Sequence, residues 1–234
     1  MYNVIMSSLK IKIDDYQMST SSQEILNNTD IVMMVSISGG GKNTIIEELL
    51  KTGKFHYVVS HTTRKPRINN GQLEKNGINY WFMDEQEMST KLDAGEFIEA
   101  KWVHESYVYG TSIDELSKAQ ASGKTPLLEI EVQGVEEIMN AKPDAKAIFI
   151  LPPSYDIWMS RLDSRGKVSD EDQKQRLETA KLELKTALRA DYFHFLVNDG
   201  LARSVEVAKN IIASGEDDRS GRSVAEHLLE RLDK

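Results

Sequence analysis

Short apolar runs alternate with segments whose hydrophobic residues recur every three or four positions, from about residue 30 onward. The runs have the length of buried strands, and the periodic segments have the spacing of amphipathic helices. Strands are expected at residues 31–35, 55–59, 80–82, 125–132, 147–151 and 193–197. Because strands and helices alternate, the pattern predicts an α/β sandwich around a mainly parallel, five-stranded core sheet.

The two ends of the chain lack this alternation of strands and helices. Residues 1–29 are a polar lead in which the alternation from Leu9 to Ile13 predicts a short edge strand, followed by a linker rich in Ser, Thr, Gln and Asn. No function is assigned to this N-terminal extension. Residues 214–222 predict a charged hinge, and residues 223–234 predict an amphipathic helix capped by Ser223.

A strand, a glycine-rich loop and a helix follow one another between Asp30 and Leu50. The loop holds Gly39, Gly40 and Gly41, and Lys42 opens the helix. Glycine backbone N–H groups, a helix N-terminus and a lysine ammonium together form a cradle for a polyphosphate. The alternative is a glycine-rich turn with a lysine there by chance.

Composition sets broad bounds on the protein. It has 234 residues, 40% hydrophobic and 28% charged, as in ordinary globular proteins, and no apolar stretch near the roughly 20 residues that span a bilayer. Cysteine is absent, which excludes disulfides and thiolate metal sites and agrees with a cytoplasmic location. A net charge of −8 argues against nucleic-acid and membrane partners. Composition leaves a monomer and a homodimer both open.

Charged side chains gather at a few places in this acidic chain. One basic cluster contains Arg64 and Arg67, which are three residues apart and can grip one phosphate, and a second contains Arg161, Arg165 and Arg176. Glu129 and Glu131 lie two apart in an expected strand and would share one face, where they would need a cation or donor groups. The alternative for the basic clusters is solvated surface charge, and the alternative for the two glutamates is an edge strand with one face in water.

The order of these pieces resembles the guanylate kinase family, whose members phosphorylate GMP with ATP, and the resemblance spans residues from about 30 to 212. The motifs that carry it are SGGGK at 38–42, SHTTRKPR at 60–67, NGINYWF at 76–82, EFIE at 96–99, YGT at 109–111, LEIEVQG at 128–134, IFILPPS at 148–154, RLDSRG at 161–166 and VND at 197–199.

The resemblance implies a P-loop NTPase sandwich with an inserted GMP-binding lobe at about residues 60–112 and a helical lid at about 155–177, within a kinase domain of residues 30–213. It implies phosphate transfer assisted by Lys42, Arg161, Arg165 and Arg176, and ATP binding by Ser38, Gly39, Gly40, Gly41, Lys42, Asn43, Thr44 and Asn198. The implied GMP-binding residues are Ser60, Arg64, Arg67, Tyr80, Glu99, Tyr109, Thr111 and Glu131, and Mg2+ would be held by Asn43 and Glu129.

Three departures from the family pattern stand out. Ser36 replaces the first loop glycine, which would strain the loop if that position needs a positive φ. Asn43 replaces the Ser or Thr that holds Mg2+, and Glu129 and Glu131 stand where Asp is usual. An active, slow enzyme is expected. The alternatives are a guanylate-kinase-like module that binds phosphorylated peptides and a related kinase of sugar phosphates.

Overall fold

The computed structural model describes residues 9–69, 71–103, 106–164 and 169–233. The chain divides into two compact units. We call residues 1–30, 56–126 and 140–143 the lobe unit, and residues 31–55, 127–139 and 144–234 the core unit. Each is described by itself.

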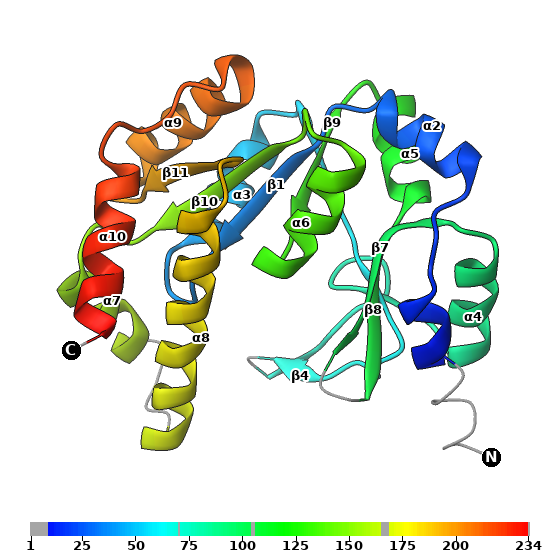
Figure 1. The fold of residues 1–234 in the computed structure, drawn as a ribbon, viewed down its shortest axis with the longest axis horizontal. Coiled ribbons are helices and arrows are strands. Elements are labelled where there is room, and N and C mark those ends of the chain that lie inside the picture. The colour runs from blue at the N-terminus through cyan, green and yellow to red at the C-terminus, as the bar shows by residue number, and fades with distance from the viewer. Residues whose placement is uncertain (1–8, 70, 104–105, 165–168, 234) are drawn as a thin grey trace. The chain divides into compact units, whose positions relative to one another are not determined.

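A five-stranded sheet organises the core unit, with strand order β11-β10-β1-β9-β2 (Figure 1). Its strands are β1 (Val32–Ser36), β2 (Phe55–Val58), β9 (Thr125–Glu129), β10 (Lys146–Leu151) and β11 (Phe193–Val197). Residues 56–58 of β2 and 125–126 of β9 fall within the lobe unit as defined above. β1 pairs in parallel with β10 and β9, and β10 pairs in parallel with β11. Ile148, Phe149 and Ile150 of β10 are fully buried, as expected of a parallel strand covered on both faces. The predicted parallel core sheet is confirmed.

Helices pack on this sheet and on one another. They are α3 (Lys42–Lys51), α6 (Val132–Ala141), α7 (Tyr155–Ser164), α8 (Asp170–Arg189), α9 (Leu201–Ser214) and α10 (Gly221–Leu232). α3 packs on α9, and α10 packs on β10, β11 and α8 (Figure 1). Ser169 caps α8 by accepting a hydrogen bond from the backbone N–H of Asp172, as its sequence pattern predicts.

The lobe unit is built on a four-stranded sheet with strand order β6-β3-β8-β7. Its strands are β3 (His61–Thr62), β6 (Trp81–Phe82), β7 (Phe97–Val103) and β8 (Tyr107–Ser112). A separate two-stranded pair joins β4 (Ile68–Asn69) to β5 (Gln72–Leu73), and the helices are α2 (Thr20–Asn27), α4 (Glu85–Asp93) and α5 (Ile113–Ala121). β7 lies at the edge of this sheet and, among the described strands, pairs with β8 in antiparallel register.

The predicted edge strand from Leu9 to Ile13 is wrong. Residues 9–14 are helical, and Leu9 is 1% exposed. Leu9 and Ile13 are four apart, so the same five letters also fit one face of a helix, and packing on the lobe unit decides between the two periods. The expected linker contains α2, capped by Ser19, whose hydroxyl accepts from the Ser22 N–H.

Two further boundaries differ from those predicted. β9 ends at Glu129, so Glu131 lies beyond the strand, and the expectation that both carboxylates share one strand face is wrong. α10 begins at Gly221 and is not capped by Ser223. A Cβ at Gly221 would lie 2.5 Å from the Phe195 Cβ, so this glycine allows the helix to start close against β11.

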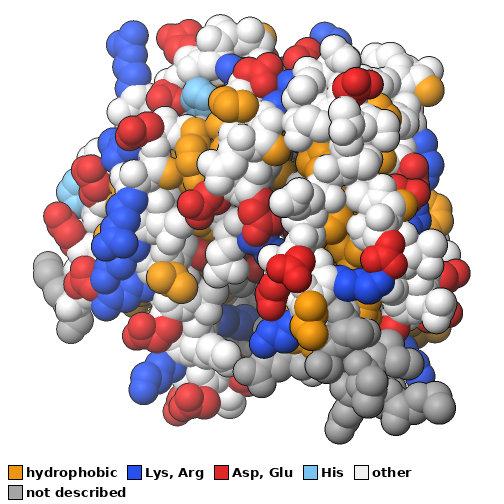
Figure 2. Space-filling model, turned by 45° about the vertical axis from the view of Figure 1, so that its right-hand side comes forward, with side chains coloured by type: hydrophobic (Ala, Val, Ile, Leu, Met, Phe, Trp, Pro, Cys, Tyr) orange, Lys and Arg blue, Asp and Glu red, His pale blue; other side chains and the backbone are white. Residues whose placement is uncertain are grey.

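Acidic and basic side chains are interspersed over the face of the molecule shown in Figure 2. No helix in the described part of the chain combines the length and the apolarity needed to cross a bilayer.

His61 is a buried histidine in β3 of the lobe unit. It is 6% exposed, its ring stacks on Trp81 with centroids 6.3 Å apart, and its Nδ1 makes no hydrogen bond within the described residues. Burial, assisted by the charge of Lys91, lowers the pKa of His61 to about 4. The folded protein therefore keeps this ring neutral.

Below pH 6.5, His61 is expected to destabilise the protein. The unfolded chain takes up a proton near pH 6.5 and the folded chain only near pH 4, so the contribution of His61 to the free energy of unfolding falls as the pH drops between these values, by about 3 kcal/mol. Urea unfolding from pH 4 to pH 8 measures this slope. Glu183 of α8, whose pKa burial raises to about 7, contributes a slope of the opposite sign in this range, so the His61 contribution is the difference between the native slope and that of His61→Gln. His227→Gln, at an exposed histidine of α10, is the control and should leave the native slope unchanged. An unchanged slope in His61→Gln would contradict the assignment.

Candidate active site

The loop between β1 and α3 has the geometry of an anion cradle. Gly39 and Gly41 have φ values of 87° and 95°, which favour glycine, and Gly41 is the N-terminal cap residue of α3. A Cβ at Gly41 would lie 2.2 Å from the Asn198 Nδ2, so the close approach of that amide also requires glycine. The loop leads directly into the first backbone N–H groups of α3, which have no partner inside the helix.

Ser36 does not strain this loop. It is the last residue of β1 and pairs in register with Ile150, so its backbone is extended and needs no positive φ. Its hydroxyl donates to the Ile37 carbonyl at 2.8 Å. A Cβ at Gly40 would lie 2.0 Å from the Ser36 Oγ in its present rotamer and 3.0 Å from the Ile150 carbonyl oxygen, so there is little room for a side chain at position 40.

Lys42 is the first residue of α3, and its ammonium forms an ion pair with Glu129 at 3.1 Å. The two side chains are 16% and 30% exposed, so the pair is partly screened from water. Asn43 and Thr44 follow in the first turn of α3 with exposed side chains. Three predicted residues, Lys42, Asn43 and Glu129, thus lie at or next to the cradle.

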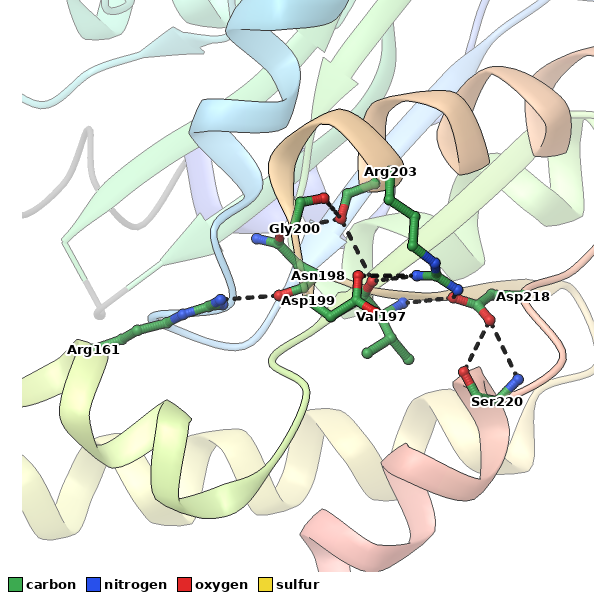
Figure 3. A network of polar contacts seen from close by, with 9 residues as sticks. Arg161, Val197, Asn198, Asp199, Gly200, Arg203, Asp218 and Ser220 are labelled. Atoms are coloured by element: carbon green, nitrogen blue, oxygen red, sulfur yellow. Dashed lines mark hydrogen bonds and ion pairs between the residues drawn. The ribbon is translucent and has the colours of Figure 1, made fainter.

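Asn198 and Arg161 both contact the backbone of this loop, and Figure 3 shows Arg161 reaching Asn198 from α7. The Asn198 Nδ2 donates to the Gly40 carbonyl at 2.9 Å, and its Oδ1 accepts from the Ser204 hydroxyl at 3.1 Å. Arg161 donates to the Asn198 carbonyl at 2.9 Å and to the Gly40 carbonyl at 3.4 Å. The resemblance implies that both residues contact ATP; in this structure both donate hydrogen bonds to the backbone of the loop.

Helices α7 and α8 complete the surroundings of the loop. The Trp158 indole, fully buried, donates to the Ser38 carbonyl at 2.7 Å. Arg176 of α8 lines a cavity of about 430 Å³, whose other lining residues are Ser38, Asp172, Gln175, Thr179 and Glu183. Arg165 lies outside the described residues.

Glu183 of α8 was not expected at this site. Burial, reinforced by the negative charge of Glu131, raises the pKa of Glu183 to about 7, and Lys42 opposes the shift. Two carboxylates and one ammonium therefore act on one another inside the core unit. The sequence offers only a weak signal for Glu183, because it is one of many charged residues in a long polar helix.

A second group of predicted residues meets in the lobe unit around Arg64. The Arg64 guanidinium, 5% exposed, donates to both carboxylate oxygens of Glu74 at 2.8 and 3.0 Å, and its Nε donates to the Tyr109 hydroxyl at 2.9 Å. Its central carbon lies 5.2 Å from the Tyr80 ring centroid. Three predicted residues, Arg64, Tyr80 and Tyr109, are thus in contact.

Glu74 was missed by the sequence analysis because it lies in an Asn- and Gly-rich loop that carries no periodic pattern. Its carboxylate also accepts from the backbone N–H of Arg67 at 2.8 Å, and Arg67 itself is exposed. The hydrogen bonds from Arg64 hold the pKa of Glu74 below its usual range. The Glu74 carboxylate therefore holds Arg64 through the arginine side chain and Arg67 through the arginine backbone N–H.

Glu99 and Thr111 face one another across β7 and β8. The two residues are register partners, both are buried, and the Thr111 hydroxyl donates to the Glu99 Oε1 at 2.7 Å. Ser60 precedes β3, and its carbonyl accepts from the Trp81 N–H at 2.9 Å. The predicted GMP-binding residue Glu131 belongs to the core unit, whereas the other seven belong to the lobe unit.

A metal site made by protein ligands alone is not present among the described residues, where no three His, Cys, Asp or Glu side chains cluster to hold an ion. Mg2+ at phosphate-transfer sites usually needs only one or two carboxylates, because substrate phosphates and water supply the remaining oxygens. Glu129 offers a carboxylate oxygen and the exposed Asn43 an amide oxygen, so this pair fits a site that needs only one or two protein ligands.

Comparison with known proteins gives a consistent result. The model of the family described as guanylate kinase matches residues 28–215. A guanylate kinase of Neisseria meningitidis serogroup A is 37% identical over 184 residues, which cover 78% of this chain and 86% of the relative. One from Legionella pneumophila is 34% identical and covers 80% of this chain and 86% of the relative. The crystal structure of guanylate kinase from Anaplasma phagocytophilum superimposes with a TM-score of 0.58 at 27% identity, covering 87% of this chain and 94% of that one.

Proposed function

This chain belongs to the guanylate kinase family, and from that premise we propose that it transfers the terminal phosphoryl group of ATP to GMP and releases GDP and ADP. The observation that carries the proposal is the cradle of β1 and α3, in which left-handed glycines lead into a helix that begins with Lys42. Such a cradle binds the phosphates of a nucleoside triphosphate.

In the lobe unit, we assign the phosphate of GMP to Arg64, Arg67, Tyr80 and Tyr109. Arg64 is supported by its packing, because Glu74 and Tyr109 orient its guanidinium plane. We assign the guanine base to Ser60, Glu99 and Thr111. A carboxylate at Glu99 accepts from the ring N–H and exocyclic amine of guanine, a donor pair that adenine lacks.

In the core unit, Lys42 neutralises the ATP phosphates, together with Arg161, Arg165 and Arg176. The loop residues Ser38 to Thr44 bind those phosphates, and we assign Asn198 to the adenine of ATP. No general base is needed, because a phosphate monoester is already largely ionised near neutral pH. Catalysis then consists of aligning two polyanions and stabilising the transferred group with fixed cations.

Mg2+ would be held by Asn43 and Glu129, directly or through water, with the remaining ligands supplied by phosphate oxygens and water. When bound, it supplies positive charge to the transferred phosphoryl group. Glu129 pairs with Lys42 at 3.1 Å, so a carboxylate and an ammonium are both present at the end of β9 and the start of α3.

The test is a coupled assay of ADP release with ATP and Mg2+ and, in parallel, GMP, AMP, UMP and ribose 1,5-bisphosphate. We expect turnover with GMP and at least a hundredfold lower kcat/KM with the others, since a ligand that lacks the donor pair of guanine loses the hydrogen bonds that we assign to the buried Glu99 carboxylate. Preference for ribose 1,5-bisphosphate would indicate a sugar-phosphate kinase. No product with any acceptor would reject the kinase proposal.

Asn43→Ser is expected to raise kcat and to lower the Mg2+ concentration that gives half-maximal rate. A serine hydroxyl on the first turn of α3 is shorter than the amide, and is the kind of ligand that P-loops use for this metal. A titration of rate against Mg2+ measures the change. Asn210→Ser, at an exposed position of α9, is the matched control. If the Mg2+ concentration at half-maximal rate is unchanged or higher in Asn43→Ser, Asn43 does not limit the rate of the native protein.

A further inference from the structure

The segment from Leu9 to Ser19 lies upstream of the residues matched by the family model and packs on the lobe unit. Leu9 is buried in one cluster, whose other buried members are Met88, Leu92, Phe97, Ala100 and Val108. Ile13 and Tyr16 pack against this cluster from the same segment. Lys12 adds a hydrogen bond to the Ser89 hydroxyl and an ion pair with Asp93. In Figure 1 this dark blue helix lies beside α4.

Tyr16 makes an unusual double contact with β7. Its hydroxyl donates to the Phe97 carbonyl at 2.6 Å and accepts from the Phe97 N–H at 2.7 Å. β7 is an edge strand, so the outward N–H and C=O groups of Phe97 have no neighbouring strand. One hydroxyl therefore satisfies both groups, and the two rings meet edge to face with centroids 6.5 Å apart.

The hydroxyl stays protonated at any physiological pH, which this double contact requires. Burial raises the pKa of Tyr16 to about 12, and the negative charges of Glu96 and Glu99 act in the same direction. A phenol in this state both donates and accepts.

The contact falls where the pairing of β7 is irregular. Phe97 pairs with Ser112 and Glu99 pairs with Thr111, so the register shifts between Phe97 and Glu99. A bulge of this kind re-aims the following side chain, and a slip of one residue would turn that side chain to the other face of the sheet. A fixed point at Phe97 therefore determines where Glu99 points.

A second fixed point lies just before the strand. The Ser19 N–H donates to the Gly95 carbonyl at 3.0 Å. Gly95 has a φ of 65°, and a Cβ there would lie 2.5 Å from the Ser19 backbone nitrogen. The segment thus holds the chain on the N-terminal side of the bulge at Gly95 and at Phe97.

We propose that residues 9–19 contribute to nucleotide binding by the lobe unit. In this proposal Tyr16 is a positioning residue, which sets the bulge of β7 and so orients Glu99 toward the guanine base. This inference rests on the proposed function. It assigns to the N-terminal segment a role in selecting the acceptor nucleotide, in addition to its packing.

The test is Tyr16→Phe in the full chain, which removes one oxygen and keeps the ring. We expect the KM for GMP to rise about tenfold, with kcat at saturating GMP and the KM for ATP unchanged. Tyr192→Phe, in the core unit, is the matched control and should leave all three values unchanged. Amide hydrogen exchange at Phe97 should become faster in Tyr16→Phe, because its N–H loses its acceptor.

A double-mutant cycle with Glu99→Gln separates positioning from general stability. If Tyr16 acts through Glu99, Tyr16→Phe should change the kcat/KM for GMP much less in the Glu99→Gln background than in the native one. Additive losses would overturn the proposal, as would a lower melting temperature with an unchanged KM for GMP. Failure of the native protein to phosphorylate GMP would instead reject the proposed function, so the two failures are distinguishable.

Discussion

Lys42→Met is expected to lower kcat for GMP phosphorylation about a thousandfold. The ammonium stands at the first turn of α3, where a triphosphate bound in the cradle would place its terminal phosphates. Cations preorganised for the charge of phosphoryl transfer contribute factors of about 10³ or more. Methionine keeps most of the side-chain volume and removes the charge and the N–H donors of the ammonium. Steady-state and single-turnover assays at saturating ATP and GMP measure the effect.

Lys209→Met is the matched control for this experiment. Lys209 lies on α9 in an exposed ion pair with Glu206 at 2.7 Å, and its loss should change neither turnover nor stability by a measurable amount. A Lys42→Met protein that turns over within tenfold of the native rate would remove Lys42 from the reaction.

Arg64→Met is expected to raise the KM for GMP about a hundredfold and to lower the free energy of unfolding by about 3 kcal/mol. The first effect follows from losing the oriented guanidinium that we assign to the GMP phosphate. The second arises because the Glu74 carboxylate, 9% exposed, would lose both hydrogen bonds and the charge of Arg64. The pKa of Glu74 should then rise, so the stability deficit should shrink as the pH falls toward 4. Substrate kinetics and urea unfolding at two pH values measure both effects.

Two variants control for the two effects of Arg64→Met. Arg189→Met, at an exposed position near the end of α8, should alter neither KM nor stability. Glu74→Gln keeps the shape of the pair but removes its charge, and should weaken GMP binding less than Arg64→Met does. If Arg64→Met is less stable yet binds GMP normally, the arginine is a structural residue and the phosphate-binding assignment is wrong.

The sequence predicts the core sheet and the cradle well because both depend on local patterns. Apolar runs such as Ile148 to Leu151 form strands only where both faces are covered, and three consecutive glycines before Lys42 permit few other structures. The grouping of Arg64 with Tyr80 and Tyr109 could not be read from periodicity or spacing. It came from resemblance to a family.

The parts that the sequence did not predict depend on contacts between distant residues. Leu9 and Ile13 fit a strand and a helix equally well, and only the cluster around Met88 selects the helix. Glu74 looks like any acidic residue in a polar loop until the lobe unit brings it against Arg64. Glu131 falls outside β9 because the strand gives way to α6, a boundary that a single sequence defines poorly.

The Gly40 carbonyl receives hydrogen bonds from both Asn198 and Arg161. In a trans peptide the carbonyl and the next N–H point in opposite directions, so anchoring this oxygen also fixes the direction of the Gly41 N–H. Rotation of this peptide plane would break both bonds at once. The cradle thus keeps its donor orientation before any anion arrives, and an incoming triphosphate has no glycine backbone to reorganise at this point.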